Sequence, residues 1–539
     1  MAPGGGDQGP ESEPGARGVP EEVDVSHRVR LLKDAYVDSV LQMAATRAMR
    51  EVDGVEWATA AMATPANVAV MEGEGFDLTG AGANDCVLAA RAGDDEAAEA
   101  ALGAGDAALG GGSRRGGAGS SPAAREPASL EEAVAELPEA NLAIVSVPGD
   151  FAALEAHKAL TAGLHVLLFS DNVPVEEEIE LKERGVALGR LVMGPGAGTA
   201  VLGGCGLGFA NAVRRGRVGV VAAAGTGAQE VMCLLDRWGA GVSAVIGVGG
   251  RDLSEAVGGR MARLAVAALR RDPGTDVILL VSKPPSPDVA RAVVAEAGDT
   301  PLVAALIGLK ESIPVPPTVR LAATLEEGAL LALELARHER PDPAAGGVAE
   351  AVEAACRDLP AERRVVRGLY SGGTLCYEAL VLLSGILGPV HSNTPLRKGW
   401  DVPAPPGSHV CLDLGEEEYT KGRPHPMIDP SIRLEHLAEV GADPTTAVVL
   451  LDVVIGYGAN RDPAGALAPV CAEVREGGAQ IVAYVLGTEA DPQGLAAQQA
   501  TLAEAGCLIA PTAARAALAA AAIVTRRPEL VLAGAGATG

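Results

Sequence analysis

Short apolar runs alternate with helical stretches of apolar periodicity along most of the chain. In the first hundred residues the pattern predicts a helix at 37–50 and strands at 55–62 and 85–91. Further strands are expected at 141–147, 165–170, 191–193, 218–222, 242–248, 277–281, 302–307, 365–370, 409–414, 447–454, 480–486 and 507–510. Because helical segments separate these later strands, the pattern predicts a multidomain α/β fold with parallel sheets covered on both faces.

Changes in composition divide the chain into segments. Residues 1–25 are rich in Gly, Pro and acidic side chains and predict a disordered tail, whereas 26–104 predict a small α+β domain. Residues 105–130 include a Gly/Ser/Ala-rich stretch, which is typical of a flexible linker. The remaining boundaries predict a βαβ domain at 131–212, two longer α/β domains at 213–345 and 346–528, and a tail at 529–539.

Two similar turns precede predicted helices in the two longer domains. One reads Gly-Thr-Gly-Ala-Gln-Glu over 225–230, the other reads Gly-Thr-Leu-Cys-Tyr-Glu over 373–378, and each follows a predicted strand. They are 148 residues apart and the apolar positions after them correspond, which indicates a duplicated unit. Thr226 is expected to cap its helix in a capping box with Gln229, while Glu230 and Glu378 suit the positive ends of their own helices.

The same turns are candidate anion sites. Gly permits close approach of the backbone, and the first amide groups of a helix have no partner within the helix. We therefore predict a phosphate or acyl-phosphate group between two facing helix ends, held by Gly225, Thr226, Gly227, Gly372, Gly373 and Thr374. Capping without any ligand is the alternative, because strand-to-helix turns of this kind are common.

Composition narrows the class of protein. The 539 residues carry a formal net charge of −27, which disfavours binding to nucleic acid and to anionic membranes. Hydrophobic residues make up 48% and aromatic residues only 2%, so the cores must consist of Ala, Val and Leu. The chain lacks a long uncharged apolar stretch and an apolar signal core, so we expect a soluble cytoplasmic protein. The eight cysteines include no CxxC pair, so we expect reduced thiols and no metal site.

A few side chains outside the Gly-Thr turns are candidates for chemistry. Arg423 and His425 lie in a Gly/Pro-rich turn after a predicted strand, where Arg can grip a carboxylate or phosphate and His can exchange protons. We predict both as catalytic residues, with a solvated loop as the alternative. Cys376, in a first helical turn, is more simply a buried inert thiol. Asp413 and Glu416–Glu418 are more simply a charged surface turn than a Mg²⁺ site.

Several motifs give the chain a resemblance to the FdrA family, a branch of the succinyl-CoA synthetase superfamily. The resemblance runs from about Val37 to Ala520. It rests on Asp38-Ser39-Val40, Thr64-Pro65-Ala66-Asn67, Arg251-Asp252-Leu253-Ser254, Ser371-Gly372-Gly373-Thr374-Leu375-Cys376-Tyr377-Glu378, Gly422-Arg423-Pro424-His425-Pro426-Met427 and Gly487-Thr488-Glu489-Ala490-Asp491-Pro492-Gln493.

The resemblance implies a domain plan and a further set of binding residues. Residues 141–200 look like the CoA-binding Rossmann domain of the superfamily, and 213–340 and 361–520 look like its two flavodoxin-like ligase domains. On this basis the expected contacts to CoA or substrate are Ser146, Pro148, Asn172, Pro174, Gly194 and Pro195.

Two departures from the superfamily limit the activity that the resemblance implies. Succinyl-CoA synthetases relay phosphate through a histidine of the first ligase domain, yet no histidine lies between His165 and His338. No segment is left for an ATP-grasp domain either. The FdrA resemblance implies instead a subunit of oxamate carbamoyltransferase, which interconverts oxalurate and phosphate with oxamate and carbamoyl phosphate in allantoin catabolism, together with partner subunits.

Two other classes of function stay open. One is a CoA-dependent acyl-CoA synthetase, similar to succinate-CoA ligase, that works with a separate nucleotide-binding subunit. The other is a non-catalytic scaffold or sensing subunit. The residues themselves require no cofactor, and CoA is the one that the resemblance suggests. Expected partners are small-molecule substrates and other subunits, and self-association into a homo-oligomer is open as well.

Overall fold

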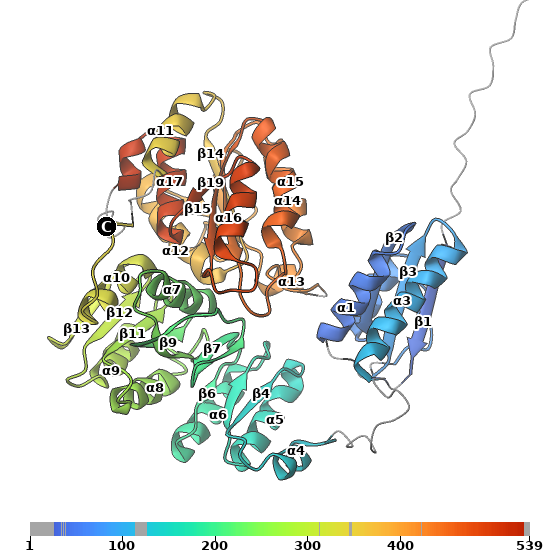
Figure 1. The fold of residues 1–539 in the computed structure, drawn as a ribbon, viewed down its shortest axis with the longest axis horizontal. Helices are drawn as coiled ribbons and strands as arrows, with labels where there is room; N and C mark the ends of the chain where they lie inside the picture. Colours follow the sequence, from blue (N-terminus) through green and yellow to red (C-terminus); the bar gives the residue numbers. More distant parts are fainter. Residues whose placement is uncertain are drawn as a thin grey trace, which may run out of the picture. The chain divides into compact units, whose positions relative to one another are not determined.

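The structure is a computed structural model, which divides into two compact units, residues 1–125 and 126–539 (Figure 1). The tail expected at 1–25 lies outside the described residues, as do 114–126 of the expected linker. The structure describes residues 26–33, 35, 37, 39–82, 84–113, 127–311, 313–343, 348–421 and 423–532.

The first unit is a small α+β fold with one antiparallel sheet, as expected. Its elements are β1 (Ser26–Leu32), α1 (Ser39–Arg50), β2 (Val55–Met62), α2 (Pro65–Gly73), β3 (Cys86–Ala92) and α3 (Asp95–Ser113). The strands stand in the order β1-β3-β2, and α1 packs against α3. Residues 105–113, where a linker was expected, belong to α3, because Ala108 and Leu109 pack against the core of this unit.

The second unit begins with a three-stranded parallel sheet in the order β4-β5-β6. Its elements are α4 (Leu130–Glu136), β4 (Leu142–Val145), α5 (Gly149–Thr161), β5 (His165–Leu168), α6 (Val175–Leu188) and β6 (Val192–Met193). This is the βαβ arrangement expected for 131–212, but residues 199–208 leave it and join the next sheet. The carboxyl ends of all three strands therefore meet at one edge of the small sheet, where ligands of open α/β sheets bind.

The next sheet has seven strands in the order β13-β12-β11-β9-β10-β7-β8. Its elements are β7 (Thr199–Leu202), β8 (Cys205–Gly208), β9 (Arg215–Ala223), α7 (Gly225–Arg237), β10 (Val242–Gly247), α8 (Arg260–Arg271), β11 (Val277–Ser282), α9 (Pro287–Ala295), β12 (Leu302–Leu306), β13 (Val319–Ala322) and α10 (Leu325–Leu335). Strands β9 to β13 are parallel, as expected. Strands β7 and β8 instead form an antiparallel hairpin at one edge, because Gly203 and Gly204 make a tight turn with positive φ.

The last sheet has six strands, all parallel, in the order β15-β16-β14-β17-β18-β19. Its elements are α11 (Val348–Asp358), β14 (Val365–Tyr370), α12 (Gly373–Leu387), β15 (Val390–His391), β16 (His409–Asp413), α13 (Glu417–Thr420), α14 (Ser431–Ala442), β17 (Thr446–Val454), α15 (Pro463–Glu476), β18 (Gln480–Leu486), α16 (Leu495–Glu504), β19 (Leu508–Ala510), α17 (Ala513–Thr525) and a 3-10 helix at Pro528–Leu532. Leu530 and Val531 are buried, so residues 529–532 belong to the fold and not to a tail.

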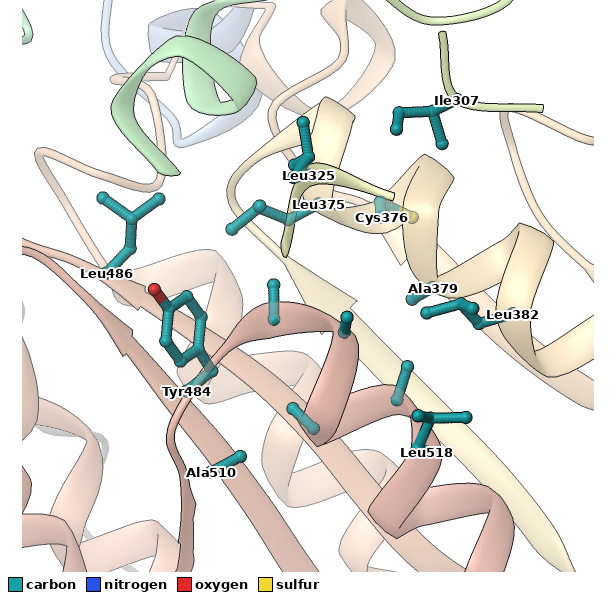
Figure 2. Close-up of a cluster of buried hydrophobic side chains, with 14 of the residues drawn as sticks. Ile307, Leu325, Leu375, Cys376, Ala379, Leu382, Tyr484, Leu486, Ala510 and Leu518 are labelled. Atoms are coloured by element: carbon teal, nitrogen blue, oxygen red, sulfur yellow. The ribbon is translucent and has the colours of Figure 1, made fainter. Parts of the chain in front are cut away.

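The two large sheets share one hydrophobic core. Helix α7 of the first half contacts α12 of the second, and α10 of the first half contacts α17 of the second. Leu325 of α10, Leu375 of α12 and Leu518 of α17 are each fully or almost fully buried in the same cluster (Figure 2). Among the described helices, none combines the length and apolarity that crossing a bilayer requires.

Two glutamates of the duplicated turns form hydrogen bonds between the two halves. Glu230 of α7 accepts a hydrogen bond from the amide of Ala513, the first residue of α17, and Glu378 of α12 accepts one from the amide of Leu325, the first residue of α10. Each carboxyl group thus faces the N-terminus of a helix in the opposite half and not the end of its own helix. Burial raises the pKa of Glu230 to about 7 and that of Glu378 to about 8.

Candidate functional site

The loops expected to bind CoA or substrate meet at one edge of the small sheet. Ser146 and Pro148 follow β4, Asn172 and Pro174 follow β5, and Gly194 and Pro195 follow β6. A β-carbon at Gly149 would clash with the carbonyl of Asp171, so the first two loops touch. A β-carbon at Gly249, in the loop after β10, would lie 2.8 Å from the carbonyl carbon of Gly194, so the first large sheet reaches this edge too.

Exposure differs among these six residues. Ser146, Pro148, Asn172 and Pro174 are exposed, whereas Gly194 and Pro195 are buried. Pro148 and Pro174 stand directly before α5 and α6, so the free first amides of both helices point to the same edge. The structure therefore brings the six residues together around an exposed edge, and their role as ligand contacts stays a prediction.

The two Gly-Thr turns are in direct contact. The amide of Thr374 donates a hydrogen bond to Oγ1 of Thr226 at 3.3 Å, and a β-carbon at Gly227 would lie 2.9 Å from Cγ2 of Thr374. Both threonines are buried. The expected convergence of the two helix ends is thus observed, but the threonine side chains fill the space directly between them. A single anion held symmetrically between Thr226 and Thr374 has no room there.

The capping expected for the first turn is wrong. Ala224 is the N-cap residue of α7, and no side chain caps this end. Thr226 is already helical, and its hydroxyl accepts from Thr374 of the other half instead of from its own helix. Gln229 likewise donates to Asn211, so neither residue takes part in a capping box.

A buried carboxylate accepts hydrogen bonds from the backbone amides that precede α12. Asp452, at the end of β17, accepts hydrogen bonds from the amides of Ser371 and Gly372 at 2.8 and 2.9 Å. Arg433, which is also buried, balances this charge at 3.3 Å. The Gly372 amide is therefore not available for phosphate, and the amide of Thr374 donates its hydrogen bond to Thr226. The amides of Gly372 and Thr374 thus have partners within the protein, and the role of these two residues in phosphate binding stays a prediction.

The end of α7 differs from that of α12. The strand position that corresponds to Asp452 in the first half is Val281, so among the described residues no carboxylate stands at the equivalent place. Gly225 is exposed, and nothing lies within 4 Å of a β-carbon built on it. The first helical hydrogen bond of α7 runs from Ala228 to Ala224, so the three preceding amides remain donors. The end of α7 is therefore open to an anion at Gly225.

Asp413 lies beside the paired helix ends. It ends β16, is 2% exposed, and its backbone is held by two hydrogen bonds to the side chain of Asn393 at 2.9 Å each. Oδ1 accepts from the amide of Gly415 at 3.0 Å, and Oδ2 faces Gly373. Burial, reinforced by the charge of Glu416, raises the pKa of Asp413 to about 7. Asp413 is therefore part of the site and not of a surface turn.

His425 and Arg423 have separate environments. Nδ1 of His425 accepts from the amide of Met427 at 3.2 Å, and Nε2 lies 2.7 Å from a β-carbon built on Gly415, on the side of Asp413. Burial lowers the pKa of His425 to about 4, so its imidazole is neutral at physiological pH. Arg423 is exposed and pairs with Glu435 of α14 at 3.4 Å. His425 thus adjoins the site, whereas no described contact brings Arg423 to it.

Cys376 is a buried core residue, as expected from the sequence. Its side chain is 0% exposed, and burial raises the pKa of its thiol well above the ordinary value. A neutral, inaccessible thiol is neither a nucleophile nor a metal ligand.

Sequence reasoning did not assign to the site two cations that follow β10 and β11 of the first large sheet. Lys283 directly follows β11 and is half-buried, and it forms no hydrogen bond or ion pair with any other residue that the structure describes. Arg251, after β10, donates to Glu178 at 2.8 Å and to the carbonyl of Val173 at 2.7 Å. The position of Lys283 just beyond a strand end, before two prolines, was a usable signal.

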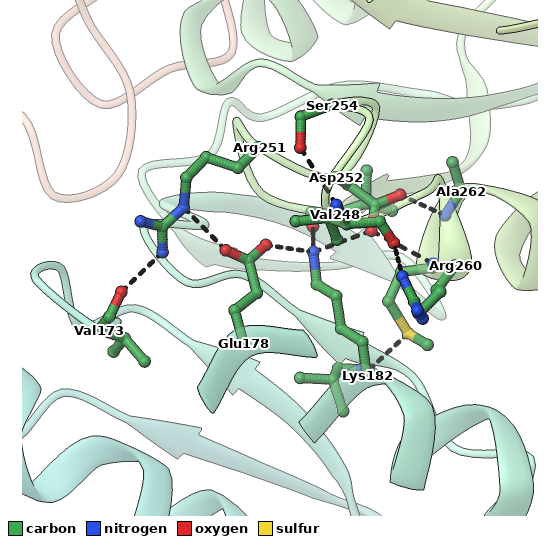
Figure 3. A network of polar contacts seen from close by, with 12 residues as sticks. Val173, Glu178, Lys182, Val248, Arg251, Asp252, Ser254, Arg260 and Ala262 are labelled. Carbon is green, nitrogen blue, oxygen red and sulfur yellow. Dashed lines mark hydrogen bonds and ion pairs between the residues drawn. The ribbon is translucent and has the colours of Figure 1, made fainter. Parts of the chain in front are cut away.

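A buried lysine fixes the loop that carries Arg251 (Figure 3). Lys182 of α6 is 0% exposed and donates to Glu178 at 2.7 Å and to Asp252 at 2.8 Å. Asp252 also accepts from the amides of Met261 and Ala262 at the start of α8. The network joins the small sheet to the first large sheet, so the loops after β5 and β10 keep a fixed relative position.

The described residues provide no metal site. They hold no group of three or more His, Cys, Asp or Glu side chains placed to bind a metal ion, and this includes Asp413 with Glu416–Glu418. In the first unit, Cys86 is buried within β3, and burial raises the pKa of its thiol to about 11.

Comparisons with known proteins agree with this architecture. A model of the CoA-ligase family matches residues 369–523, and a model described as AllF, heavy metal-associated domain matches residues 25–126. The uncharacterized protein YahF of Escherichia coli (strain K12) is 38% identical over 502 residues, which cover 90% of this chain and 96% of YahF.

More distant similarity extends to ligases. Subunit SauD of the ADP-forming sulfoacetate-CoA ligase of Bilophila wadsworthia (strain 3_1_6) is 29% identical over 179 residues, 31% of this chain and 60% of SauD. Among solved structures, the apo form of dinucleotide forming acetyl-coenzyme A synthetase 1 of Ca. Korarchaeum cryptofilum is 16% identical. It covers 72% of this chain and 84% of that one, with a TM-score of 0.29.

Proposed function

We propose a function on the premise that the chain belongs to the family of the Escherichia coli protein YahF and carries a CoA-ligase domain. The protein is an FdrA-type subunit of an oxamate carbamoyltransferase. It binds phosphate or carbamoyl phosphate at the end of α7, and it works together with partner subunits. The family model at residues 25–126, which bears the name AllF, is compatible with a role in allantoin catabolism.

The observation that carries this proposal is the asymmetry of the duplicated helix ends. The α12 end is neutralised by Asp452, whereas the α7 end keeps free amide donors and an exposed glycine. A positive helix end of this kind favours a doubly charged phosphoryl group. An acyl phosphate held there has its carbonyl directed away from the helix, where an amine nucleophile can reach it.

The missing histidine supports group transfer over nucleotide-driven ligation. No histidine lies between His165 and His338, so the first large sheet cannot carry a phosphohistidine. Direct transfer of a carbamoyl group between nitrogen and phosphate oxygen needs no phosphoenzyme. It needs an anion site and a group that carries a proton.

The test is turnover by the chain alone and with its partner subunits. We expect oxalurate and phosphate to yield carbamoyl phosphate only when the partners are present. We also expect Gly225→Pro, which constrains the exposed end of α7, to abolish the reaction while thermal unfolding stays cooperative. Turnover that is unaffected by this variant would remove the α7 end from the site.

A CoA-dependent ligase is the second candidate. The gathering of Ser146, Asn172 and Gly194 at one edge of a Rossmann-like sheet favours it, because that edge is where such folds bind cofactors. Titration calorimetry with CoA separates the two candidates. Binding that is lost in Asn172→Ala would favour the ligase, and a lack of heat at millimolar CoA would favour the carbamoyltransferase.

A further inference from the structure

Lys283 directly follows β11 and lies beside the N-terminal end of α7. The ladder between β9 and β11 ends at the pair Ala223 and Ser282, and Ala224 is the N-cap of α7. Lys283 is therefore level with the first free amides of the helix. It is half-buried and makes no hydrogen bond or ion pair with the other described residues. An unpaired, partly desolvated ammonium group at such a position needs a counter-anion.

Asp413, the carboxyl group that Lys283 influences, does not fill that need. The charge of Lys283 acts on Asp413, yet the two side chains form no ion pair. Oδ2 of Asp413 faces Gly373 and likewise makes no hydrogen bond to a described residue. Lys283 and Asp413 thus lie within electrostatic range of each other without forming a direct contact. Lys283 lies beside the end of α7, and Oδ2 of Asp413 lies beside Gly373 at the end of α12.

We propose that Lys283 and Asp413 are the two ionisable side chains of the reaction site, with Lys283 binding a phosphoryl oxygen and Asp413 carrying the proton. This proposal rests on the proposed carbamoyl transfer and deepens it. The ammonium group and the α7 amides hold phosphate from two sides, while the carboxyl group faces the bond that changes.

The proton balance of the reaction gives Asp413 its role. When phosphate attacks the carbamoyl carbon, a C–O bond forms, the C–N bond breaks, and the leaving nitrogen must gain a proton. Asp413 donates that proton and recovers one from the hydrogen phosphate, so the net reaction neither consumes nor releases protons. A carboxyl group whose pKa burial raises to about 7 holds such a proton at neutral pH and can also release it.

The test uses the full chain with its partner subunits and inorganic phosphate as the probe. We expect Lys283→Met to bind phosphate about tenfold more weakly in ³¹P NMR titrations, since a charge-assisted hydrogen bond is lost. Lys283→Arg keeps the charge and should stay close to the wild type. Lys158→Met is the matched control, because Lys158 pairs with Glu155 on α5, away from the helix ends.

Asp413→Asn separates binding from proton transfer. We expect phosphate affinity to be retained or improved, the transfer rate to fall about 10²-fold to 10⁴-fold, and the limb of the pH–rate profile near pH 7 to disappear. Thermal unfolding of each variant checks that it is folded. Equal phosphate affinity in Lys283→Met and Lys158→Met overturns the proposal, as does an unchanged pH profile in Asp413→Asn.

The outcomes also distinguish this proposal from the proposed function. If the wild-type complex transfers no carbamoyl group but loses phosphate affinity in Lys283→Met, the proposed reaction fails and the anion role of Lys283 stands. If transfer occurs and is indifferent to Lys283→Met, the inference fails and the function stands. Absence of phosphate binding in the wild type overturns both.

Discussion

The carboxyl group of Glu378 makes stability depend on pH in a direction opposite to that of most acidic side chains. Burial, with the nearby carboxylates of Glu230 and Glu326, raises its pKa from 4.5 to about 8. The folded state therefore favours the neutral acid. Its contribution to stability is complete below pH 4.5 and is lost as the pH rises to about 8. The change over that range corresponds to about 5 kcal/mol.

The perturbation that tests this is Glu378→Gln. Glutamine keeps the oxygen that accepts from Leu325 but cannot ionise, and its amide group adds unsatisfied donors that cost about 1–3 kcal/mol. We therefore expect the variant to be slightly less stable than the wild type at pH 5 and more stable at pH 9. Thermal unfolding of both proteins between pH 5 and 9 measures the difference.

Two controls sharpen the result. Glu230→Gln should show the same trend with a smaller amplitude, because the pKa of Glu230 is raised only to about 7. Glu255→Gln, at an exposed position, should show no pH-dependent difference from the wild type. If the melting temperature of Glu378→Gln relative to the wild type stays constant from pH 5 to 9, the reasoning is refuted.

Four further substitutions test the contacts that shape the site. Asp452→Ala should lower the free energy of unfolding by about 3–5 kcal/mol in denaturant titrations, because it leaves the buried charge of Arg433 unpaired; a smaller loss than 1 kcal/mol would contradict this. Lys182→Met should cost a similar amount for the same reason, again measured by denaturation. Gly227→Ala should cost about 1–3 kcal/mol by overpacking against Thr374, whereas Gly225→Ala, in open space, should be nearly neutral; equal melting temperatures would refute the contrast.

Most of the fold was predictable from the sequence. Parallel strands buried on both faces appear as continuous apolar runs, and for this reason β9, β14, β17 and β18 were recognised. Elements were missed where this signal is weak. Strand β1 carries Arg28 and Arg30, which pair with acidic residues of α3, so its sequence is polar. The hairpin of β7 and β8, residues 199–208, contains five glycines or alanines and few larger apolar side chains.

The candidate site was predictable only in part. A glycine-rich turn between a strand and a helix is a local feature, and both turns were found from their spacing. Whether the amides before α12 are free depends on Asp452. This residue is about 80 residues away from them in the sequence and is adjacent only because β17 pairs with β14. The residues near the turn give no indication that β14 pairs with β17. The exposure of Arg423 and the burial of Asp413 likewise follow from how neighbouring loops pack.

The sequence by itself determined the alternation of strands and helices, the duplicated Gly-Thr turns and the loss of the relay histidine, because each is written in residues that lie close together along the chain. The tertiary structure alone decided that the two helix ends touch through Thr226 and Thr374, that Asp452 accepts from the amides before α12, and that Oδ2 of Asp413 faces Gly373. These facts depend on distances between residues that are far apart in the sequence. They also depend on burial, which sets the charge state of Asp413 and His425.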